Sequence, residues 1–554
     1  MNTYKFLKIA TIFFAAVATS CTKLDQSLNS TLTNNQAANA LGPNGTQLLL
    51  QTAYNDFGNP YSDLGAIFAL EEVSADECLV PTRAGDWDDN GRFRKLHQHT
   101  FLAEGEDQFN NLNKLNFDAT NVLAFNPTKK QAAEARFLRA LSLYQLLDLF
   151  GQCPFRDPGD NLLNAPKVYS GDSATLFIID ELTTILPDLD VSSNPVTDIM
   201  GKTRATQDAA KFLLMRVYLN RGAFANRANP VFADADMQKV ISLGNEIINS
   251  GRYSYNPSFF NNFDVTNYDS PEGIFAYPNY SGVVTNNSDI RQRWWSPLHY
   301  NQIPSGSSQP VAGWNGFSTV ADFYNAFGVT TTPTQTIVDS LLDKRIGWRF
   351  YPNCTEISGI RPGLLIGQQY DQNGVKYKDR KGNDLVYKTA FSPDLKDIGN
   401  DLELTGIRIV KYPPDYTGGP TFPNYGEKKA GNWLMMFRYP DVILMVAEAK
   451  LRAEATDAAG ALALVNGLRT ARGAAPLVSL PLVNTADVYD AKTLLAERGR
   501  ELYWENVRRT DLVRFGMFLK PWAYKPASDP KYLVYPIPAS ALASNPNLKQ
   551  NNGY

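Results

Sequence analysis

Cysteine and histidine are scarce in this chain of 554 residues, and their scarcity argues against several kinds of site. The cysteines are Cys21, Cys78, Cys153 and Cys354, and the histidines are His97, His99 and His299. Wide cysteine spacing without a C-x-x-C pair argues against a disulfide framework and against a structural zinc site. His97 and His99 would share one face of a strand, but one further imidazole is too few for a metal centre, so we expect no bound metal.

The usual enzyme motifs are also missing. The chain has no G-x-S-x-G, H-E-x-x-H or G-x-G-x-x-G pattern. Gly201-Lys202-Thr203 matches the end of a phosphate loop, but Val196 stands where the first glycine is needed, so the cradle cannot form. With 56 acidic residues, carboxylate pairs are too common to nominate a glycosidase pair. We therefore predict no catalytic residue and no cofactor, with a surface glycoside hydrolase as the less favoured alternative.

No strong charge of either sign is present. The 53 basic and 56 acidic residues leave a formal net charge of −3. Such a chain has no basic field for phosphates, which argues against a nucleic-acid partner. Aromatic residues are abundant instead, at 12% of the chain with 27 Tyr, 30 Phe and 8 Trp. Because aromatic rings either fill cores or form flat binding surfaces, their positions have to decide their role.

The N-terminus is typical of a cleaved secretory signal. Two lysines precede an apolar run over residues 9–17, and Ala18-Thr19-Ser20 leads directly into Cys21. The run is too short for a membrane span, which needs roughly 20 residues. Residues 18–21 resemble a bacterial lipobox, which implies that residues 1–20 are removed and that Cys21 carries the lipid. Several acyl chains on Cys21 would hold the protein firmly at a membrane.

Apolar periodicity predicts a mainly α-helical fold. It is clearest over residues 128–150, where Thr128 and Gln131 have capping-box spacing and Gly151 ends the pattern. Similar amphipathic runs cover residues 36–57, 174–186, 205–224, 237–249, 440–455, 458–471 and 491–509. Short helices in pairs predict a stacked scaffold of the tetratricopeptide kind, mainly over residues 34–250 and 433–520.

Between about residues 251 and 432 the composition changes. Tyr, Pro, Gly, Asn and Trp are frequent there, and only short helices near Ala321 and Gln335 are indicated. We predict a large loop-rich insertion with little strand. A loop-rich segment of this length in a compact domain is usually functional, so we expect it to carry ligand-binding residues.

Three segments together carry a family resemblance. They read AEARFLRA at 133–140 with LFG at 149–151, FRYPDVILMVAEA at 437–449 with VNGLR at 465–469, and ERGRELYWE at 497–505 with DLVRFG at 511–516. YPIP at 535–538 and NPNLKQN at 545–551 close the chain. In this order and with the lipobox, they resemble the SusD/RagB family over nearly the whole length.

The resemblance implies a SusD-like fold, with residues 21–554 as one domain that contains tetratricopeptide-like helix pairs. It also implies an outer-membrane lipoprotein that faces the cell exterior and delivers an oligosaccharide or similar nutrient to a SusC-like TonB-dependent barrel. Such a protein binds its ligand without turnover, so we expect no enzyme activity. A binder of peptides or glycopeptides, and a helical-repeat scaffold without a small ligand, remain alternatives.

Charged residues of the third segment have spacings that predict a structural role. Glu505 precedes Arg508 and Arg509 by three and four positions, and Asp511 precedes Arg514 by three. These spacings place opposite charges on adjacent helical turns. We interpret them as a network that holds helices together.

A glycan site needs exposed rings for the apolar sugar faces, flanked by polar groups for the hydroxyls. The loop over residues 83–90 has this composition, with Arg83, Asp86, Trp87, Asp88 and Asn90. In similar proteins the loop at this place contributes an aromatic side chain to the glycan site. Trp87 is therefore the first candidate, and the alternative is a structural tryptophan packed under its neighbours.

A second aromatic loop contains Arg291, Trp294, Trp295 and Tyr300, with Trp314 farther along. Side chains alternate in an extended segment, so one of Trp294 and Trp295 is expected to be exposed. These rings are further candidates for ligand stacking, and the alternative is that they cover the helical layer. Arg291 would then hydrogen-bond a hydroxyl or lie in solvent.

Overall fold

The computed structural model of the chain describes residues 42, 44–279, 290, 292–302, 312–328, 343–347, 362–371, 374–413 and 432–554. The predictions on Cys21, on Arg291 and on a helix near Gln335 lie outside these residues, as does the side chain of Trp294. Thr46–Tyr554 forms one compact unit with a continuous apolar core. Within the described residues, no helix is both long enough and apolar enough to cross a bilayer.

Helix α6 (Lys129–Phe150) begins and ends where its sequence predicts. Thr128 accepts a hydrogen bond from the Gln131 backbone N–H at 3.2 Å, and the Gln131 side chain accepts one from the Thr128 backbone N–H at 3.0 Å. This reciprocal capping box satisfies two backbone donors that have no partner inside the helix. Gly151 ends the helix at φ 72°, a conformation that costs glycine little.

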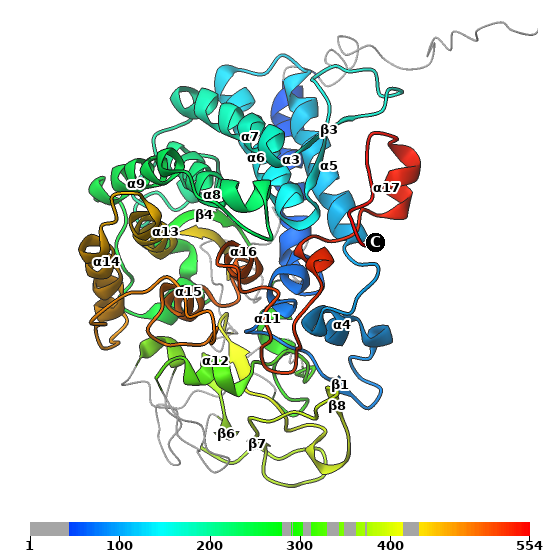
Figure 1. Cartoon of the computed structure of the whole chain (residues 1–554), viewed down its shortest axis with the longest axis vertical. Helices are drawn as coiled ribbons and strands as arrows, with labels where there is room; N and C mark the ends of the chain where they lie inside the picture. The colour runs from blue at the N-terminus through cyan, green and yellow to red at the C-terminus, as the bar shows by residue number, and fades with distance from the viewer. Residues whose placement is uncertain are drawn as a thin grey trace, which may run out of the picture. The chain divides into compact units, whose positions relative to one another are not determined.

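The predicted scaffold of helix pairs is confirmed. Along the chain, α5 packs on α6, α6 on α7, α7 on α8, α8 on α9, α9 on α13 and α13 on α14 (Figure 1). Their bounds are α5 (Glu106–Leu123), α7 (Gly171–Ile185), α8 (Gln207–Ala225), α9 (Asp234–Asn249), α13 (Tyr439–Arg452) and α14 (Ala458–Ala471). Helix α3 (Gly45–Ser62) matches the later part of the helix predicted over residues 36–57, whose beginning lies outside the described residues, and α5 was not predicted. Each helix buries its apolar face against the next one, so the array is stable only as a stack.

The predicted long helix over residues 491–509 is wrong. Two short helices occupy this region, α15 (Leu494–Leu502) and α16 (Arg508–Arg514). Trp504 and Asn506 between them have φ of 61° and 60°, in the left-handed region that a right-handed helix cannot contain. The chain therefore turns after α15, and α16 leaves in a new direction.

The insertion contains short two-stranded pairs, as expected for a region with little strand. β4 (Gly273–Tyr277) pairs with β10 (Leu434–Arg438), β5 (Gly363–Leu365) with β9 (Arg408–Val410), and β6 (Gly367–Gln368) with β7 (Val386–Tyr387), all antiparallel. A fourth pair, β1 (Thr82–Arg83) with β8 (Lys396–Asp397), is parallel. This last pair places the loop over residues 83–90 beside the insertion.

The remaining elements are short. They include the antiparallel pair β2 (Gln152–Phe155) and β3 (Lys167–Ser170), the π-helix η1 (Ala69–Val73), several 3₁₀ turns, among them η4 (Gly201–Thr203) and η7 (Lys344–Ile346), and the helices α4 (Arg92–Gln98), α11 (Gln292–Trp295), α12 (Ala321–Asn325) and α17 (Ala539–Ser544). Helix α12 confirms the helix predicted near Ala321.

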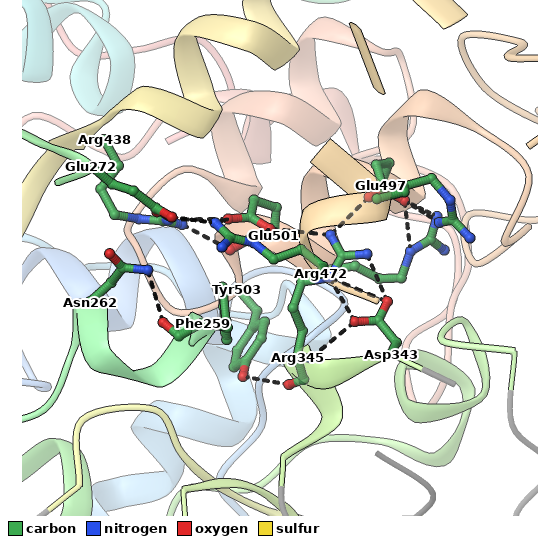
Figure 2. A network of polar contacts seen from close by, with 12 residues as sticks. Phe259, Asn262, Glu272, Asp343, Arg345, Arg438, Arg472, Glu497, Glu501 and Tyr503 are labelled. Carbon is green, nitrogen blue, oxygen red and sulfur yellow. Dashed lines mark hydrogen bonds and ion pairs between the residues drawn. The ribbon is translucent and has the colours of Figure 1, made fainter. Parts of the chain in front are cut away.

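A buried network of ion pairs joins the C-terminal helices to the insertion (Figure 2). Glu501 of α15 contacts three guanidinium groups, those of Arg345 at 3.2 Å, Arg438 at 3.1 Å and Arg472 at 2.8 Å. All four side chains have no solvent exposure. Burial alone would raise the pKa of Glu501, but Arg472 and Arg438 lower it to about 2. The residues come from η7, β10, the C-cap of α14 and α15, so the network connects segments far apart in the sequence.

The prediction of a helix-holding charge network in the third segment is confirmed, but its partners differ. Only Asp511 and Arg514 form the expected pair within one helix, at 2.6 Å. Glu505 instead contacts Lys411 and Arg438, each at 2.6 Å, because the break between α15 and α16 separates it from Arg508.

The two arginines at the start of α16 pair with segments far away in the sequence. Arg508 contacts Asp76 at 2.6 Å, and Arg509 lies 3.8 Å from Asp148 of α6. These charges therefore hold α16 against the N-terminal half of the chain.

Candidate functional site

The loop over residues 83–90 is held in a tight, sharply turned conformation. The backbones of Arg83 and Asp86 exchange hydrogen bonds at 2.8 and 3.0 Å, which closes the loop on itself. Ala84, Trp87 and Asn90 all have positive φ, at 56°, 58° and 54°. Non-glycine residues enter this region only when their surroundings hold them there, and such positions are frequent at ligand sites. Strand pairing of β1 with β8 is the fixed base from which the loop projects.

Trp87 is packed on one side and open on the other. Its ring meets Phe93 and Phe317 edge-on, with centroids 5.7 and 5.4 Å away, and its indole N–H donates to the Trp314 carbonyl at 2.8 Å. A β-carbon on Gly316 would lie 2.3 Å from the Trp87 ring, so the ring position requires glycine there. The residue is half-buried. Trp87 therefore has part of its ring at the surface in a fixed orientation.

Trp314 is the more exposed partner of Trp87. Its side chain has 45% of its surface exposed, and its ring centroid lies 6.1 Å from that of Trp87. Below it, Trp295 is 7% exposed, with its ring centroid 5.5 Å from that of Trp314. The backbone N–H of Trp314 donates to the Trp295 carbonyl at 2.8 Å. We call Trp87 and Trp314 the tryptophan pair, because they form adjoining aromatic surface on a buried support.

Tyr300 connects the tryptophan pair to a polar group of the insertion. Its hydroxyl donates to Asp86, the neighbour of Trp87 in the chain. Arg380 lies over the Tyr300 ring, with its guanidinium carbon 3.9 Å from the ring centroid. Glu403 accepts a hydrogen bond from the Arg380 side chain at 2.5 Å and another from its backbone N–H at 3.2 Å. Burial and the bond to Asp86 raise the pKa of Tyr300 to about 12, so the hydroxyl remains a donor at neutral pH.

His299 supports this group from inside the protein. Its Nε2 lies 2.7 Å from Glu403, and its Nδ1 accepts the backbone N–H of Asn301 at 3.1 Å. Because burial lowers the pKa of His299 to about 4, the ring is neutral at pH 7 and its proton lies on Nε2. The neutral ring thus fixes Glu403 and the turn at Asn301 together. The exposed Asn301 side chain also donates to the Lys378 carbonyl at 2.8 Å.

Arg83, one of the predicted ligand-binding residues, is buried. It is 2% exposed, and its donors bind internal acceptors, among them the Asn315 carbonyl at 2.6 Å and the Thr405 carbonyl at 2.9 Å. It also forms an ion pair with the buried Asp397 at 3.3 Å. A guanidinium inside the protein must satisfy its donors there, and Arg83 does so by joining its loop to the insertion.

The other members of the loop remain at the surface. Asp86, Asp88 and Asn90 are exposed, and the Asp88 carboxylate lies 3.5 Å from Arg94. Asp86 and Asp88 flank Trp87 in the chain, so their exposed carboxylates offer hydrogen-bond acceptors next to it in the sequence.

The prediction that one of Trp294 and Trp295 is exposed assumed an extended backbone. The backbone here is helical. Trp294 and Trp295 belong to α11, so the alternation of a strand does not apply. Trp295 is buried and serves as the support of Trp314.

The two histidines expected on one face of a strand lie at the end of helix α4 instead. His97 contacts the carbonyls of Cys78 and Ala523 at 3.0 and 2.9 Å, and His99 contacts the Ser74 carbonyl at 2.8 Å. In the part of the chain that the structure describes, no group of three His, Cys, Asp or Glu could hold a metal ion.

Arg380, Asn301 and Glu403 were not predicted, although they lie around Tyr300. Arg380 is exposed and lies in the turn of a short hairpin in which Lys378 pairs with Asp384. No motif in the sequence marks this hairpin, because its relation to Tyr300 exists only in three dimensions. The assembled arrangement can stack a flat apolar ring on the tryptophan pair, and Asp86 and the groups around Tyr300 can offer donors and acceptors.

Comparison with known proteins adds independent evidence. The model of the SusD family matches residues 271–554. The starch-binding protein SusD of Bacteroides thetaiotaomicron is 26% identical over 517 residues, which cover 88% of this chain and 85% of that protein. A SusD-like protein of Formosa agariphila is 22% identical over 555 residues, which cover 95% of this chain and 90% of that protein.

Solved structures with the same fold include surface glycan-binding protein A from Bacteroides uniformis, with a TM-score of 0.63 at 19% identity, covering 91% of this chain and 98% of that one. A laminarin-binding SusD-like protein has a TM-score of 0.64 at 18% identity, covering 92% and 99%. These similarities extend over almost the whole length of each structure, so they establish the fold of the entire described scaffold.

Proposed function

This chain belongs to the SusD family, and we propose that it is a non-catalytic lipoprotein that binds an oligosaccharide at the tryptophan pair. The observation that carries the proposal is the exposed ring of Trp314 beside Trp87, whose chain neighbour Asp86 is joined through Tyr300 to the exposed Arg380. A sugar ring has an apolar face and a rim of hydroxyls, and this surface has a matching part for each. The names of the starch-binding and laminarin-binding relatives support a glycan as the ligand.

Stacking on the tryptophans supplies the apolar part of the affinity. A tryptophan side chain has about 200 Å² of surface, so covering the exposed 45% of Trp314 removes roughly 100 Å² from water. At about 25 cal/mol per Å², this burial stabilises the complex by roughly 2 kcal/mol. Trp87 adds a smaller area next to it.

Hydrogen bonds around the tryptophan pair would set the orientation of the sugar. Asp86 and Asp88 offer carboxylate acceptors, Asn90 and Asn301 offer amides, and Arg380 offers charged donors. Charged partners form shorter and stronger bonds to hydroxyls than neutral ones do. Arg380 covers one face of Tyr300, so this tyrosine contributes mainly its edge and its bond to Asp86.

We further propose that lipid on Cys21 holds the protein at the outer membrane, facing the cell exterior, where it passes its ligand to a SusC-like TonB-dependent barrel. Family membership and the lipobox-like sequence before Cys21 support this part. Replacing Cys21 with Ser is expected to move the protein from the membrane fraction to the soluble fraction. Co-purification of a barrel with the tagged full-length chain would test the partner.

Calorimetric titration with a panel of oligosaccharides tests the ligand. Trp87→Ala and Trp314→Ala are expected to abolish or strongly weaken the binding of any glycan that the wild type binds. Phe117→Ala is the matched control, because Phe117 of α5 is a similarly exposed aromatic residue, at 43%, that lies outside the site.

Chromatography of the recovered glycan should show it unaltered. Cleavage of the glycan, or full affinity in both tryptophan variants, would refute the proposal. Binding of peptides instead of glycans from a parallel panel would favour the peptide or glycopeptide alternative.

A further inference from the structure

A cavity of about 160 Å³ lies between helix α3, the turn η4 and strand β4, and it shares no residue with the site described above. Gln51 and Asn55 of α3 form one side, Thr203 and Arg204 the other, and Tyr277 of β4 part of the floor. Its volume is close to that of a buried cavity of about 150 Å³ that holds a benzene molecule in another protein. There is room for one six-membered ring.

The floor of the cavity requires a glycine inside helix α3, and this glycine destabilises the helix. A β-carbon on Gly58 of α3 would lie 1.8 Å from the Tyr277 ring, so this ring lies directly on the glycine. Glycine inside a helix destabilises it by comparison with alanine, and the close approach of Tyr277 explains why glycine is needed. Phe57 meets Tyr277 edge-on, with ring centroids 5.7 Å apart. The floor is therefore a fixed aromatic surface.

On the Arg204 side of the cavity, the charge of the arginine is neutralised by Glu134. Its guanidinium lies 4.2 Å from the centroid of the Tyr54 ring, and Nε and Nη2 each lie 2.9 Å from Glu134. The Tyr54 hydroxyl donates to the same carboxylate at 2.7 Å. Arg204 and Glu134 therefore cancel in charge. The second terminal nitrogen of Arg204 has no partner among the described residues and remains a free donor on a side chain that is 33% exposed.

The opposite side carries neutral amides. The Gln51 side chain donates to the Asn55 carbonyl oxygen at 3.1 Å, which fixes the two amides one helical turn apart. This bond leaves the Gln51 oxygen as an acceptor and the Asn55 nitrogen as a donor. Together with Arg204, the cavity offers donors and acceptors without net charge, over an aromatic floor.

We infer that this cavity is a second binding site, sized for one neutral sugar ring and separate from the tryptophan pair. Hydroxyl groups both donate and accept, so they match the amides of Gln51 and Asn55 and the free nitrogen of Arg204. An anion would meet an arginine already neutralised by Glu134, and the volume accommodates a single ring. A ligand of this size binds weakly, with a dissociation constant on the order of 1 mM.

Saturation-transfer NMR with free glucose, galactose, mannose and xylose as probes tests the inference. The experiment uses the chain with both Trp87→Ala and Trp314→Ala, so that the tryptophan pair does not contribute. At least one monosaccharide is expected to give a transfer signal with this variant. Adding Asn55→Trp, which places a large ring on a residue that lines the cavity, should abolish the signal. Thr52→Trp is the control, because Thr52 is exposed on the same helix but does not line the cavity.

Three outcomes overturn the inference: no signal from any monosaccharide with the double tryptophan variant, a signal that survives Asn55→Trp, or a signal that Thr52→Trp also removes. If Asn55→Trp does not fold by circular dichroism, the pair Gln51→Ala and Asn55→Ala replaces it, with loss of signal expected. The proposed function is tested separately, by the oligosaccharide titrations of Trp87→Ala and Trp314→Ala. These variants leave this cavity intact, so the two proposals can fail independently.

Discussion

Replacing Glu501 with glutamine tests whether the buried ion network holds the insertion to the helical scaffold. Glutamine keeps the size of the side chain but removes the charge that three arginines share. Arg345, Arg438 and Arg472 would then lie in the interior with less compensation. Breaking a buried ion pair by removing one partner typically costs about 3–5 kcal/mol, because the remaining charge is left without solvent.

The pKa of Glu501 gives a similar magnitude. The arginines lower this pKa from 4.5 to about 2 against the opposing effect of burial. At about 1.4 kcal/mol per pKa unit, the ionised form is favoured in the folded state by about 3 kcal/mol. Because the folded pKa is below the unfolded one, this stability is present above pH 4.5 and is lost as the pH falls toward 2. Both estimates lead to the same expected loss in Glu501→Gln.

Urea denaturation at pH 7, followed by circular dichroism, measures the effect. We expect the free energy of unfolding to fall by about 3 kcal/mol in Glu501→Gln. Glu454→Gln is the matched control, because Glu454 is exposed, and a change within about 0.5 kcal/mol is expected there. A loss below about 1 kcal/mol in Glu501→Gln would refute the idea that this network stabilises the junction.

Three further predictions concern the site and the interior. Glu403→Gln should weaken glycan binding about tenfold in calorimetry, since it frees Arg380 from its position over Tyr300, and unchanged affinity would contradict this. Gly316→Ala should displace the Trp87 ring and lower glycan affinity with little change in melting temperature, whereas wild-type affinity would show that the ring need not lie there. Burial raises the pKa of Glu77 from 4.5 to about 7, so its contribution to stability is present below pH 4.5 and is lost as the pH rises through 7. Glu77→Gln should therefore show a smaller fall in unfolding free energy from pH 5 to pH 8 than the wild type, and equal falls would refute the assignment.

Sequence periodicity predicts the bounds of α6 correctly, because both ends of this helix have local causes. Helix α6 begins at a capping box and ends at Gly151, and both signals lie within a few residues of the boundary. The break between α15 and α16 has no such signal. Trp504 adopts its left-handed φ because the bonds of its neighbourhood, such as its backbone N–H to Glu77 at 3.0 Å, hold it there. A contact with a residue over 400 positions away cannot be predicted from local sequence.

The contrast between local signals and long-range contacts also applies to the candidate site. Composition alone pointed to Trp87 as an exposed ring, because no apolar periodicity surrounds it, and the structure places part of this ring at the surface. Composition could not separate Arg83, which is buried, from Arg380, which is exposed. Both have polar neighbours in sequence. What separates them is the parallel pairing of β1 with β8, which encloses Arg83 between its loop and the insertion.

The rings of the tryptophan pair are held rigidly, which affects the affinity for a ligand. The Trp87 ring is fixed by its bond to the Trp314 carbonyl and by its contact with Gly316, and Trp314 rests on Trp295. A surface that is already ordered loses little conformational entropy on binding, so more of the stacking energy appears as affinity. Polar groups around the pair are equally fixed, since Glu403 positions Arg380 and His299 positions Asn301. The affinity of this site should therefore depend on residues that never touch the ligand, and Glu403 and Gly316 are the two positions where that dependence can be measured.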